Sequence, residues 1–316
     1  MIVDLIMDHT GLGISDIYKI VDTAPLRYRV YDIPKKSGGD REIAQPSRPL
    51  KSLQYVIIQY LNDLPVHDSA AAYCSGKSIF DNADYHKKSN YILKLDFQSF
   101  FNSLLVKDWD AYIRKNRISL SQEDQFVIRK LLFYGDGSRN PRFLSVGAPS
   151  SPLVSNLLMY DFDQAVSDIC DENGVRYTRY ADDITLSSKT SLSLKKTEEN
   201  VKKLIRKSKS PRLSLNTKKE GRFSRAQRRM VTGLVITPDY KVSIGRERKR
   251  LISSMVHKIV IGSDRSPEHI SKTKGYLSFA NNCDPVFLSN LEKKYDKKIL
   301  RSIINFEIPH PSSFDK

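Results

Sequence analysis

Two adjacent carboxylates interrupt a β-prone run in the sequence Tyr177-Thr178-Arg179-Tyr180-Ala181-Asp182-Asp183-Ile184-Thr185-Leu186. The pattern predicts two short strands within residues 175–187, joined by a tight turn at Ala181-Asp182-Asp183. In an apolar setting two neighbouring carboxylates repel each other, and loss of water penalises both charges. A bound divalent cation removes this difficulty, whereas the plainer interpretation is a β-turn, in which Asp is common. The residues alone leave these two interpretations evenly balanced.

A third carboxylate ends another short apolar segment. The sequence Tyr91-Ile92-Leu93-Lys94-Leu95-Asp96 is expected to form a strand with Asp96 at its end. Mg²⁺ binds proteins through one or two carboxylates together with substrate phosphates. Two such ions about 3.5–4 Å apart can activate a hydroxyl and stabilise a leaving pyrophosphate. Carboxylates on neighbouring strands beside a basic surface would therefore suit nucleotidyl transfer.

The positive charge of the chain is concentrated in one region. The net charge is +16, and residues 189–258 hold 21 Lys and Arg against 5 Asp and Glu, so the remaining residues balance to zero. Nucleic acid is the favoured partner, because neutralised phosphates release counterions. The alternative is a surface that only keeps the protein soluble.

Composition excludes several classes of protein. Of the 316 residues, 40% are apolar and 28% are charged, which is typical of a globular chain rather than a disordered one. No apolar run approaches about 18 residues, so we expect no membrane association, and the first residues do not resemble a signal peptide. The three cysteines are scattered and suggest neither a disulfide framework nor a zinc site. The expected location is the cytoplasm.

The rest of the pattern mixes helices with strands. Short helices are expected before residue 27, followed by a hairpin over residues 28–44 and a helix over residues 50–64. Residues 231–236 are expected to form one strand that pairs with residues 241–244, and residues 246–260 and 271–295 are expected to be helical. Because strands and helices do not alternate regularly, the predicted fold class is α+β rather than a doubly wound sheet.

Five blocks, in order along the chain, resemble the motifs of reverse transcriptases. The central block is Tyr180-Ala181-Asp182-Asp183, which fits the Tyr-x-Asp-Asp motif of that family. The other four are Arg41-x-Ile43-x-x-Pro46 with Leu50-Lys51-x-Leu53-Gln54, Leu93-Lys94-Leu95-Asp96-Phe97-Gln98-Ser99-Phe100-Phe101, Gly147-Ala148-Pro149-Ser150-Ser151-Pro152-x-x-Ser155-Asn156, and Leu215-Asn216-x-Lys218-Lys219. Together they extend from about Tyr28 to Gly245, and five ordered blocks are too many for a chance match.

Two further blocks resemble retron reverse transcriptases in particular. They are Asn82-Ala83-Asp84-Tyr85-His86, which fits Asn-Ala-x-x-His, and Val231-Thr232-Gly233, which fits Val-Thr-Gly. The alternative is a reverse transcriptase of another bacterial lineage, derived from a group II intron or a diversity-generating element. A third interpretation, an RNA-binding module on an inactive polymerase fold, is disfavoured because all three carboxylates are present.

The resemblance implies a right-hand polymerase fold with fingers, a palm of antiparallel sheet plus helices, and a helical thumb. The expected divisions are an N-terminal helical segment at 1–26, fingers with the Asn-Ala-x-x-His segment at 27–90, a palm at 91–230 with a fingers insertion at about 105–145, and a palm–thumb hairpin with an RNA-binding thumb at 231–316.

The resemblance also implies an activity and partners. The expected enzyme is an RNA-directed DNA polymerase that copies a dedicated structured non-coding RNA into branched multicopy single-stranded DNA (msDNA), an RNA–DNA hybrid. Synthesis would be self-primed from a 2′-hydroxyl of the same RNA and would serve anti-phage defence. The expected partners are the cognate retron RNA as template and primer, its msDNA product, dNTPs, a retron-encoded effector protein, and host RNase H acting on the template.

By the same resemblance, Asp96, Asp182 and Asp183 are the catalytic residues and hold two Mg²⁺ ions, for which Mn²⁺ could substitute. The backbone carbonyl of Phe97 is expected to add a metal ligand. Phe101, five residues after Asp96, is the expected aromatic gate against a 2′-hydroxyl, with a place in the core as the alternative; Phe100 is expected in the core.

The remaining assignments concern phosphate and RNA. The nucleotide-binding residues are expected to be Lys35, Lys36, Arg41, Phe101, Gly147, Ala148, Lys218 and Lys219. An exposed basic turn is the alternative for the first three, and the sequence does not choose between the two adjacent lysines 218 and 219. Val146 stands where many reverse transcriptases have Gln, so a side-chain hydrogen bond is lost there. The RNA-binding residues are expected to be Asn82, His86, Gly233, Arg246, Arg248, Lys249 and Arg250. The i, i+4 pair Asn82 and His86 could equally be structural.

Overall fold

The computed structural model describes residues 2–35 and 38–307. The chain divides into two compact units, each built from two separate parts of the sequence. Unit 1 comprises Met1–Lys77 and Tyr91–Arg222, and unit 2 comprises Ser78–Asn90 and Phe223–Lys316. The segment Ser78–Asn90, which the sequence grouped with the fingers, therefore belongs with the C-terminal part of the chain.

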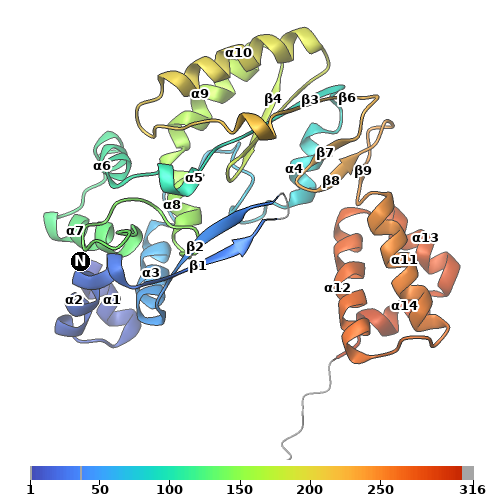
Figure 1. The fold of residues 1–316 in the computed structure, drawn as a ribbon, viewed down its shortest axis with the longest axis horizontal. Helices are drawn as coiled ribbons and strands as arrows, with labels where there is room; N and C mark the ends of the chain where they lie inside the picture. Colours follow the sequence, from blue (N-terminus) through green and yellow to red (C-terminus); the bar gives the residue numbers. More distant parts are fainter. Residues whose placement is uncertain (1, 36–37, 308–316) are drawn as a thin grey trace, which may run out of the picture. The chain divides into compact units, whose positions relative to one another are not determined.

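Unit 1 is built on a four-stranded sheet with the strand order β4-β5-β3-β6. The strands are β3 (Tyr91–Asp96), β4 (Arg176–Tyr180), β5 (Asp183–Ser188) and β6 (Gly221–Ser224). Strand β5 is antiparallel to both β3 and β4. Figure 1 shows helices α9 (Tyr160–Asp171) and α10 (Ser191–Lys207) lying together over one face of this sheet. The predicted hairpin around the two adjacent carboxylates is confirmed.

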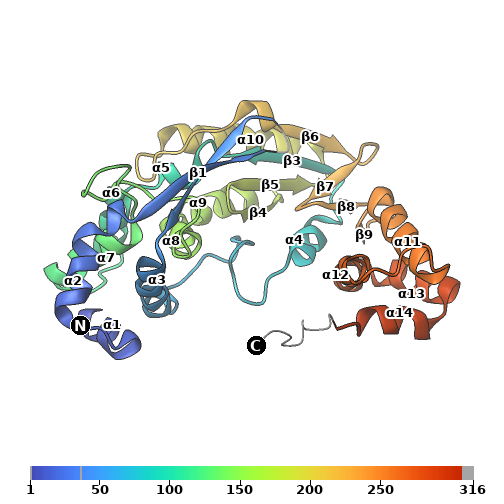
Figure 2. The same ribbon diagram turned by 60° about the horizontal axis from the view of Figure 1, so that its bottom comes forward.

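Short helices and a hairpin precede the sheet, as the sequence predicts. They are α1 (Ile2–Thr10), α2 (Ile14–Thr23), the 3₁₀ turn η1 (Ala24–Leu26), β1 (Tyr28–Pro34), β2 (Asp40–Pro46) and α3 (Arg48–Leu61). Strands β1 and β2 form a separate antiparallel pair, and Figure 2 shows this pair as a long two-stranded ribbon. Helix α3 carries Pro in its first turn, where the fixed φ of proline suits a helix start.

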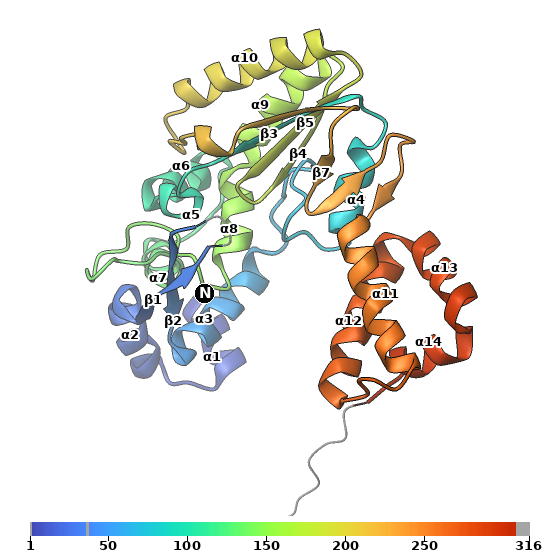
Figure 3. The same ribbon diagram turned by 45° about the vertical axis from the view of Figure 1, so that its right-hand side comes forward.

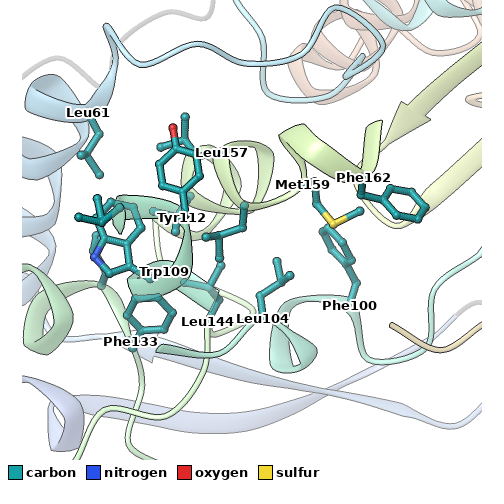
Figure 4. Packing of buried hydrophobic residues seen from close by; sticks show 14 of the residues in the cluster. Leu61, Phe100, Leu104, Trp109, Tyr112, Phe133, Leu144, Leu157, Met159 and Phe162 are labelled. Atoms are coloured by element: carbon teal, nitrogen blue, oxygen red, sulfur yellow. The ribbon is translucent and has the colours of Figure 1, made fainter. Parts of the chain in front are cut away.

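An apolar core joins the N-terminal helices to the sheet within unit 1. Four short helices contribute to it: α5 (Phe100–Ser103), α6 (Val106–Lys115), α7 (Gln122–Leu132) and α8 (Ser151–Leu158). Figure 4 shows Trp109 packed among aromatic and aliphatic side chains, and Phe100 beside Met159 and Phe162. Phe100 is buried, as expected, and its ring stacks near that of Phe97. This core fixes the end of β3 that carries Asp96.

Unit 2 combines a three-stranded sheet with helices. Its elements are α4 (Ile79–His86), β7 (Arg229–Val231), β8 (Leu234–Ile236), β9 (Val242–Ser243), α11 (Arg246–Val260), α12 (Pro267–Cys283), α13 (Pro285–Tyr295) and α14 (Lys297–Ile304). Helix α4 packs on the sheet, and Figure 3 shows α11 to α14 packed as a bundle. Within residues 2–35 and 38–307, no helix is long and apolar enough to span a bilayer.

One prediction in this unit is wrong and two are confirmed. Residues 231–236 do not form one strand, because Thr232 and Gly233 form a turn with φ values of 45° and 80°. Residues 271–295 are helical as predicted except at Asp284, which ends α12 and whose side chain accepts a hydrogen bond from the backbone N–H of Phe287, capping α13. The helix over 246–260 is confirmed.

Candidate active site

The three predicted carboxylates meet at one end of the sheet in unit 1. Asp96 lies opposite Asp183 in the β3–β5 pairing, and Ala181 and Asp182 form the two-residue loop between β4 and β5. The backbone N–H of Phe97 donates to the carbonyl of Asp182 at 3.0 Å, which ties the loop to the end of β3. Antiparallel pairing thus brings together residues that lie almost 90 positions apart in the sequence.

This grouping makes the negative charges unfavourable. Burial raises the pKa of Asp182, and the charge of Asp96 raises it further. Burial also raises the pKa of Asp183, to about 6, despite the nearby charge of Lys94. The site therefore attracts cations, since any positive charge placed there relieves desolvation and repulsion together.

A lysine supplies one such charge. The Nζ of Lys219 lies 2.7 Å from Oδ2 of Asp96, and this hydrogen bond raises the pKa of Lys219. Lys219 belongs to the 3₁₀ turn η2 (Thr217–Lys219), which is held in place because Asn216 N–H donates to the carbonyl of Asp96 at 2.8 Å. Lys218 is exposed. Of the two adjacent lysines, the geometry therefore brings Lys219 to the carboxylates.

The carboxylates also fit a divalent metal ion shared with a substrate. Within residues 2–35 and 38–307, no group of three or more His, Cys, Asp or Glu side chains is arranged so that it could hold a metal ion. Mg²⁺-type sites of nucleotide enzymes do not need three such side chains, because one or two carboxylates combine with substrate phosphates and water. Asp96, Asp182 and Asp183 are oxygen donors of the kind that such sites use.

A pocket of about 300 Å³ opens in the same unit. Three residues predicted from the sequence line it: Phe101, Gly147 and Ala148. Phe101 is half-buried at its wall, unlike its fully packed neighbour Phe100. An aromatic ring at the wall of a nucleotide-sized pocket is what a gate against an extra hydroxyl requires.

Lys51, Tyr55 and Tyr73 are among the residues of the same pocket that were not predicted as site residues. Tyr55 and Tyr73 are more than half exposed. The i, i+4 spacing of Lys51 and Tyr55 on α3 was the available signal, since it places both on one helix face. Tyr73 has a φ of 61°, a conformation that the sequence around it does not predict.

The loop at Gly147 packs directly against β2. A Cβ on Gly147 would meet the carbonyl of Ala44 and a methyl of Ile43 at 3.0 Å, and its φ of 126° also disfavours any other residue. The backbone carbonyl of Val146 accepts a hydrogen bond from Ala44 N–H at 2.9 Å. At the position where Gln was expected, the chain therefore anchors the loop through its backbone while the residue lines the pocket.

The predicted fingers cations lie on the β1–β2 pair. Arg41 is exposed on β2, and its charge lowers the pKa of both Tyr73 and Asp182 against the stronger effect of their burial. Lys35 is exposed near the end of the hairpin. Lys36 lies outside the described residues. Arg41 is thus close enough to act electrostatically on the carboxylate site.

The predicted RNA-binding residues lie in unit 2 and differ in exposure. Asn82 and His86 are 3% and 0% exposed, on the face of α4 packed toward the β7–β9 sheet, which favours their structural interpretation. The turn of Thr232 contacts the same helix, because its Oγ1 donates to the carbonyl of Ile79 at 3.0 Å. The Asn-Ala-x-x-His and Val-Thr-Gly blocks, about 150 residues apart, therefore form one packed element.

The four predicted RNA-binding residues on α11 are not equivalent. Arg248 donates to the carbonyl of Gly233 at 3.0 Å, and Lys249 pairs with Asp284 at 2.8 Å. Arg246 and Arg250 are exposed. Two of the four cations are therefore engaged within unit 2, and the other two face solvent.

Comparison with known proteins agrees with this geometry. Residues 33–236 match the family model described as reverse transcriptase (RNA-dependent DNA polymerase). The chain is 39% identical over 279 residues to the Retron Ec83 reverse transcriptase of Escherichia coli, an alignment that covers 87% of this chain and 89% of that protein. It is 33% identical over 304 residues to the Retron Ec86 reverse transcriptase of Escherichia coli, with 92% and 89% covered.

A solved structure is similar at the level of fold. Telomerase from Candida tropicalis, in complex with a TWJ fragment of telomeric RNA, matches with a TM-score of 0.50 at 13% identity. The match covers 87% of this chain and 57% of that one. It agrees with the expected right-hand polymerase architecture, and the family model and the two relatives identify the function. The chain belongs to the reverse transcriptase family, and within it to the retron reverse transcriptases, which are RNA-directed DNA polymerases.

Proposed function

We propose that this enzyme copies a dedicated structured RNA into DNA by two-metal nucleotidyl transfer at Asp96, Asp182 and Asp183. The observation that carries the proposal is the convergence of three half-buried or buried carboxylates at one sheet end, with raised pKa values for Asp182 and Asp183. Two Mg²⁺ ions, or Mn²⁺ in their place, would relieve that repulsion, activate the primer hydroxyl and stabilise the leaving pyrophosphate. The carbonyl of Phe97 is a further proposed ligand.

The chain's own residues would orient the nucleotide. Phe101 closes one wall of the pocket and excludes a ribose 2′-hydroxyl, while Gly147 and Ala148 let the backbone approach the nucleotide. Arg41 and Lys35 would bind the triphosphate from the fingers, Arg41 through its fork of N–H donors. Asp96 would serve as a metal ligand, and Lys219 would then bind the pyrophosphate oxygens instead of Asp96.

RNA would be held mainly by the basic region. Residues 189–258 hold the whole net positive charge of the chain, and Arg246 and Arg250 are two exposed residues of this region on α11. Gly233, Arg248 and Lys249 would then shape the binding surface rather than contact phosphate directly. In this proposal residues 27–77 act as fingers, 91–222 as palm, and the β7–β9 sheet with α11 to α14 as the thumb region.

The similarity of this chain to retron reverse transcriptases supports a specific reaction cycle. The cognate RNA would act as template and as primer through one internal 2′-hydroxyl, and the product would be msDNA. Host RNase H would remove template RNA, and a retron-encoded effector would use the complex in anti-phage defence in the cytoplasm.

The test is to express the chain with its upstream DNA and to analyse RNase-treated nucleic acid on a denaturing gel. We expect a discrete short DNA that shifts after treatment with a debranching enzyme. The variant Asp182→Ala/Asp183→Ala should lose it, whereas the exposed adjacent pair changed in Asp171→Ala/Glu172→Ala should keep it. If the first variant made as much DNA as wild type, the site assignment would be wrong. Activity of the purified chain only on generic primed RNA, with no branched DNA, would contradict self-priming.

A further inference from the structure

We propose that Arg179 is a positioning residue. Its buried side chain hydrogen-bonds to the turn between β4 and β5 and thereby fixes the position of the Asp182 carboxylate. The inference rests on the proposed role of Asp96, Asp182 and Asp183 as metal ligands. It assigns a task to a buried cation that neither binds substrate nor faces solvent.

The first observation is a fully buried ion pair under the hairpin. The side chains of Arg179 on β4 and Asp163 on α9 are both 0% exposed. Arg179 donates through Nε to Oδ1 of Asp163 at 2.8 Å and through Nη2 to Oδ2 at 2.6 Å. Tyr177 donates its hydroxyl to the same carboxylate at 2.5 Å. The two-pronged geometry fixes the plane of the guanidinium, which a single contact would not do.

The second observation is what the remaining donors of that plane contact. Nη1 donates to the carbonyl of Ala181 at 3.2 Å, and Nη2 also donates to Oδ1 of Asn156 on α8 at 3.2 Å. Ala181 has a φ of 55°, which is a costly conformation for a residue with a Cβ. Such a conformation persists only where the surroundings enforce it. The hydrogen bond from Arg179 holds the carbonyl of Ala181, which belongs to the peptide group that joins Ala181 to Asp182.

The third observation is that Arg179 and Asn156 also hydrogen-bond to the chain segment that leads into the pocket. The backbone of Arg179 pairs with the segment before Tyr73, since its N–H donates to the carbonyl of Ser69 and its carbonyl accepts from Ala71 N–H, both at 2.8 Å. Asn156 donates to the carbonyl of Ala72 at 2.9 Å. Tyr73, the next residue, lines the pocket. One residue therefore links the carboxylate turn to a wall of the nucleotide pocket.

A merely stabilising ion pair makes a different prediction from a positioning one. If Arg179 only adds stability, its replacement lowers the melting temperature, and the molecules that remain folded bind metal and turn over normally. If Arg179 positions Asp182, the folded variant binds metal more weakly and has a lower kcat, with the KM for dNTP little changed.

The test uses Arg179→Lys, which keeps a charge for Asp163 but removes the planar fork. Mn²⁺ binding is measured by electron paramagnetic resonance on the full chain with primed RNA, a dideoxy-terminated primer and dNTP. We expect about 10-fold weaker Mn²⁺ binding, by analogy with residues that orient metal ligands. We expect kcat to fall about 100-fold, as a misplacement of about 1 Å can cause, with KM within about threefold of wild type.

The matched control is Arg229→Lys, which alters the other fully buried arginine, in unit 2. It should lower the melting temperature without weakening Mn²⁺ binding. A second variant, Arg179→Lys/Ala181→Gly, tests the turn directly, because glycine adopts a positive φ without enforcement. It should recover at least about 10-fold of the lost kcat.

Two results would overturn the inference. One is wild-type Mn²⁺ affinity in folded Arg179→Lys; the other is a complete lack of recovery on adding Ala181→Gly. The variant Asp182→Asn separates failure of the inference from failure of the proposed site. If Asp182→Asn weakens Mn²⁺ binding while Arg179→Lys does not, the metal assignment stands and the positioning role falls. If neither weakens it, both fall.

Discussion

The molecule contains two hairpins whose loops have the same length but whose buried arginines have different partners. The β4–β5 hairpin of unit 1 and the β7–β8 hairpin of unit 2 both turn in two residues, one of which is not glycine and has a positive φ. The first strand of each hairpin contains a fully buried arginine, Arg179 in β4 and Arg229 in β7. They differ in the partners of that arginine.

Arg179 is neutralised and Arg229 is not. The charge of Asp163 raises the pKa of Arg179 against the effect of its burial. Arg229 donates to the carbonyls of Ser89 and Thr237, and its Nε has no hydrogen-bond partner among the described residues. Burial accordingly lowers its pKa. The β4–β5 hairpin, which carries carboxylates, is thus held by an ion pair. The β7–β8 hairpin, which packs on α4, is held by hydrogen bonds from Arg229 to backbone carbonyls.

The largest expected effect comes from removing the first arginine. Arg179→Met leaves Asp163 as a buried charge without a cation, which should lower the free energy of unfolding by about 3–5 kcal/mol. Urea unfolding of the purified chain measures this. The variant Arg179→Met/Asp163→Leu removes both charges and should recover much of the loss. A loss equal in the single and double variants would contradict the role of charge.

The same change at the second arginine should cost less. Arg229→Met leaves two carbonyls without their donor but no buried charge, so we expect a loss of about 1–3 kcal/mol. Urea unfolding under the same conditions makes the two values comparable. The comparison between the hairpins fails if Arg229→Met costs more than Arg179→Met.

The acids of the first hairpin give it a pH dependence that the second lacks. Because the pKa of Asp183 is about 6 in the folded chain and 3.8 is its usual value, the folded state binds more protons between these pH values. Its charge therefore destabilises the metal-free protein above pH 6, and this effect disappears as the pH falls toward 4. With a chelator present, Asp183→Asn should raise the melting temperature by a few degrees at pH 7.5 and by nothing measurable near pH 4. An equal rise at both pH values would contradict the assignment.

The smallest effects concern the turns themselves. Ala181→Gly should stabilise the chain by about 1 kcal/mol, because glycine adopts the positive φ without a Cβ clash. Thr232→Gly removes a similar strain but also the hydrogen bond to Ile79, so its net change should be below about 0.5 kcal/mol. Differential scanning calorimetry resolves the two, and Ala181→Ser, which keeps a Cβ, is the control. A larger gain at Thr232 than at Ala181 would reverse the comparison.

The sequence predicted what depends on local pattern. The β4–β5 hairpin, the strand that ends at Asp96 and the helix over 246–260 all follow from apolar periodicity and turn residues. The separate environments of Phe100 and Phe101 follow from their adjacent positions on a short helix. The turn at Thr232 was missed because Thr favours strands, and only the tertiary contact with α4 explains its positive φ.

The sequence could not predict contacts that join distant elements. Lys219 reaches Asp96 across 123 positions, and Arg179 meets an aspartate on a helix that carries no motif. Neither pairing has a periodic signature, because each depends on how the sheet, α9 and the turn η2 pack. The choice between Lys218 and Lys219 is of the same kind, since both have identical chemistry and only the fold separates them.

The discontinuity of unit 2 has a consequence for how such enzymes can be cut and recombined. The chain passes between the units three times, after Lys77, after Asn90 and after Arg222. A single cleavage at any one of these points leaves the units covalently joined. A truncation after Arg222 would strand α4 and leave buried His86 without the β7–β9 sheet that covers it. Chimeras that exchange the C-terminal third between relatives must therefore exchange residues 78–90 together with it, although the two segments are separate in the sequence.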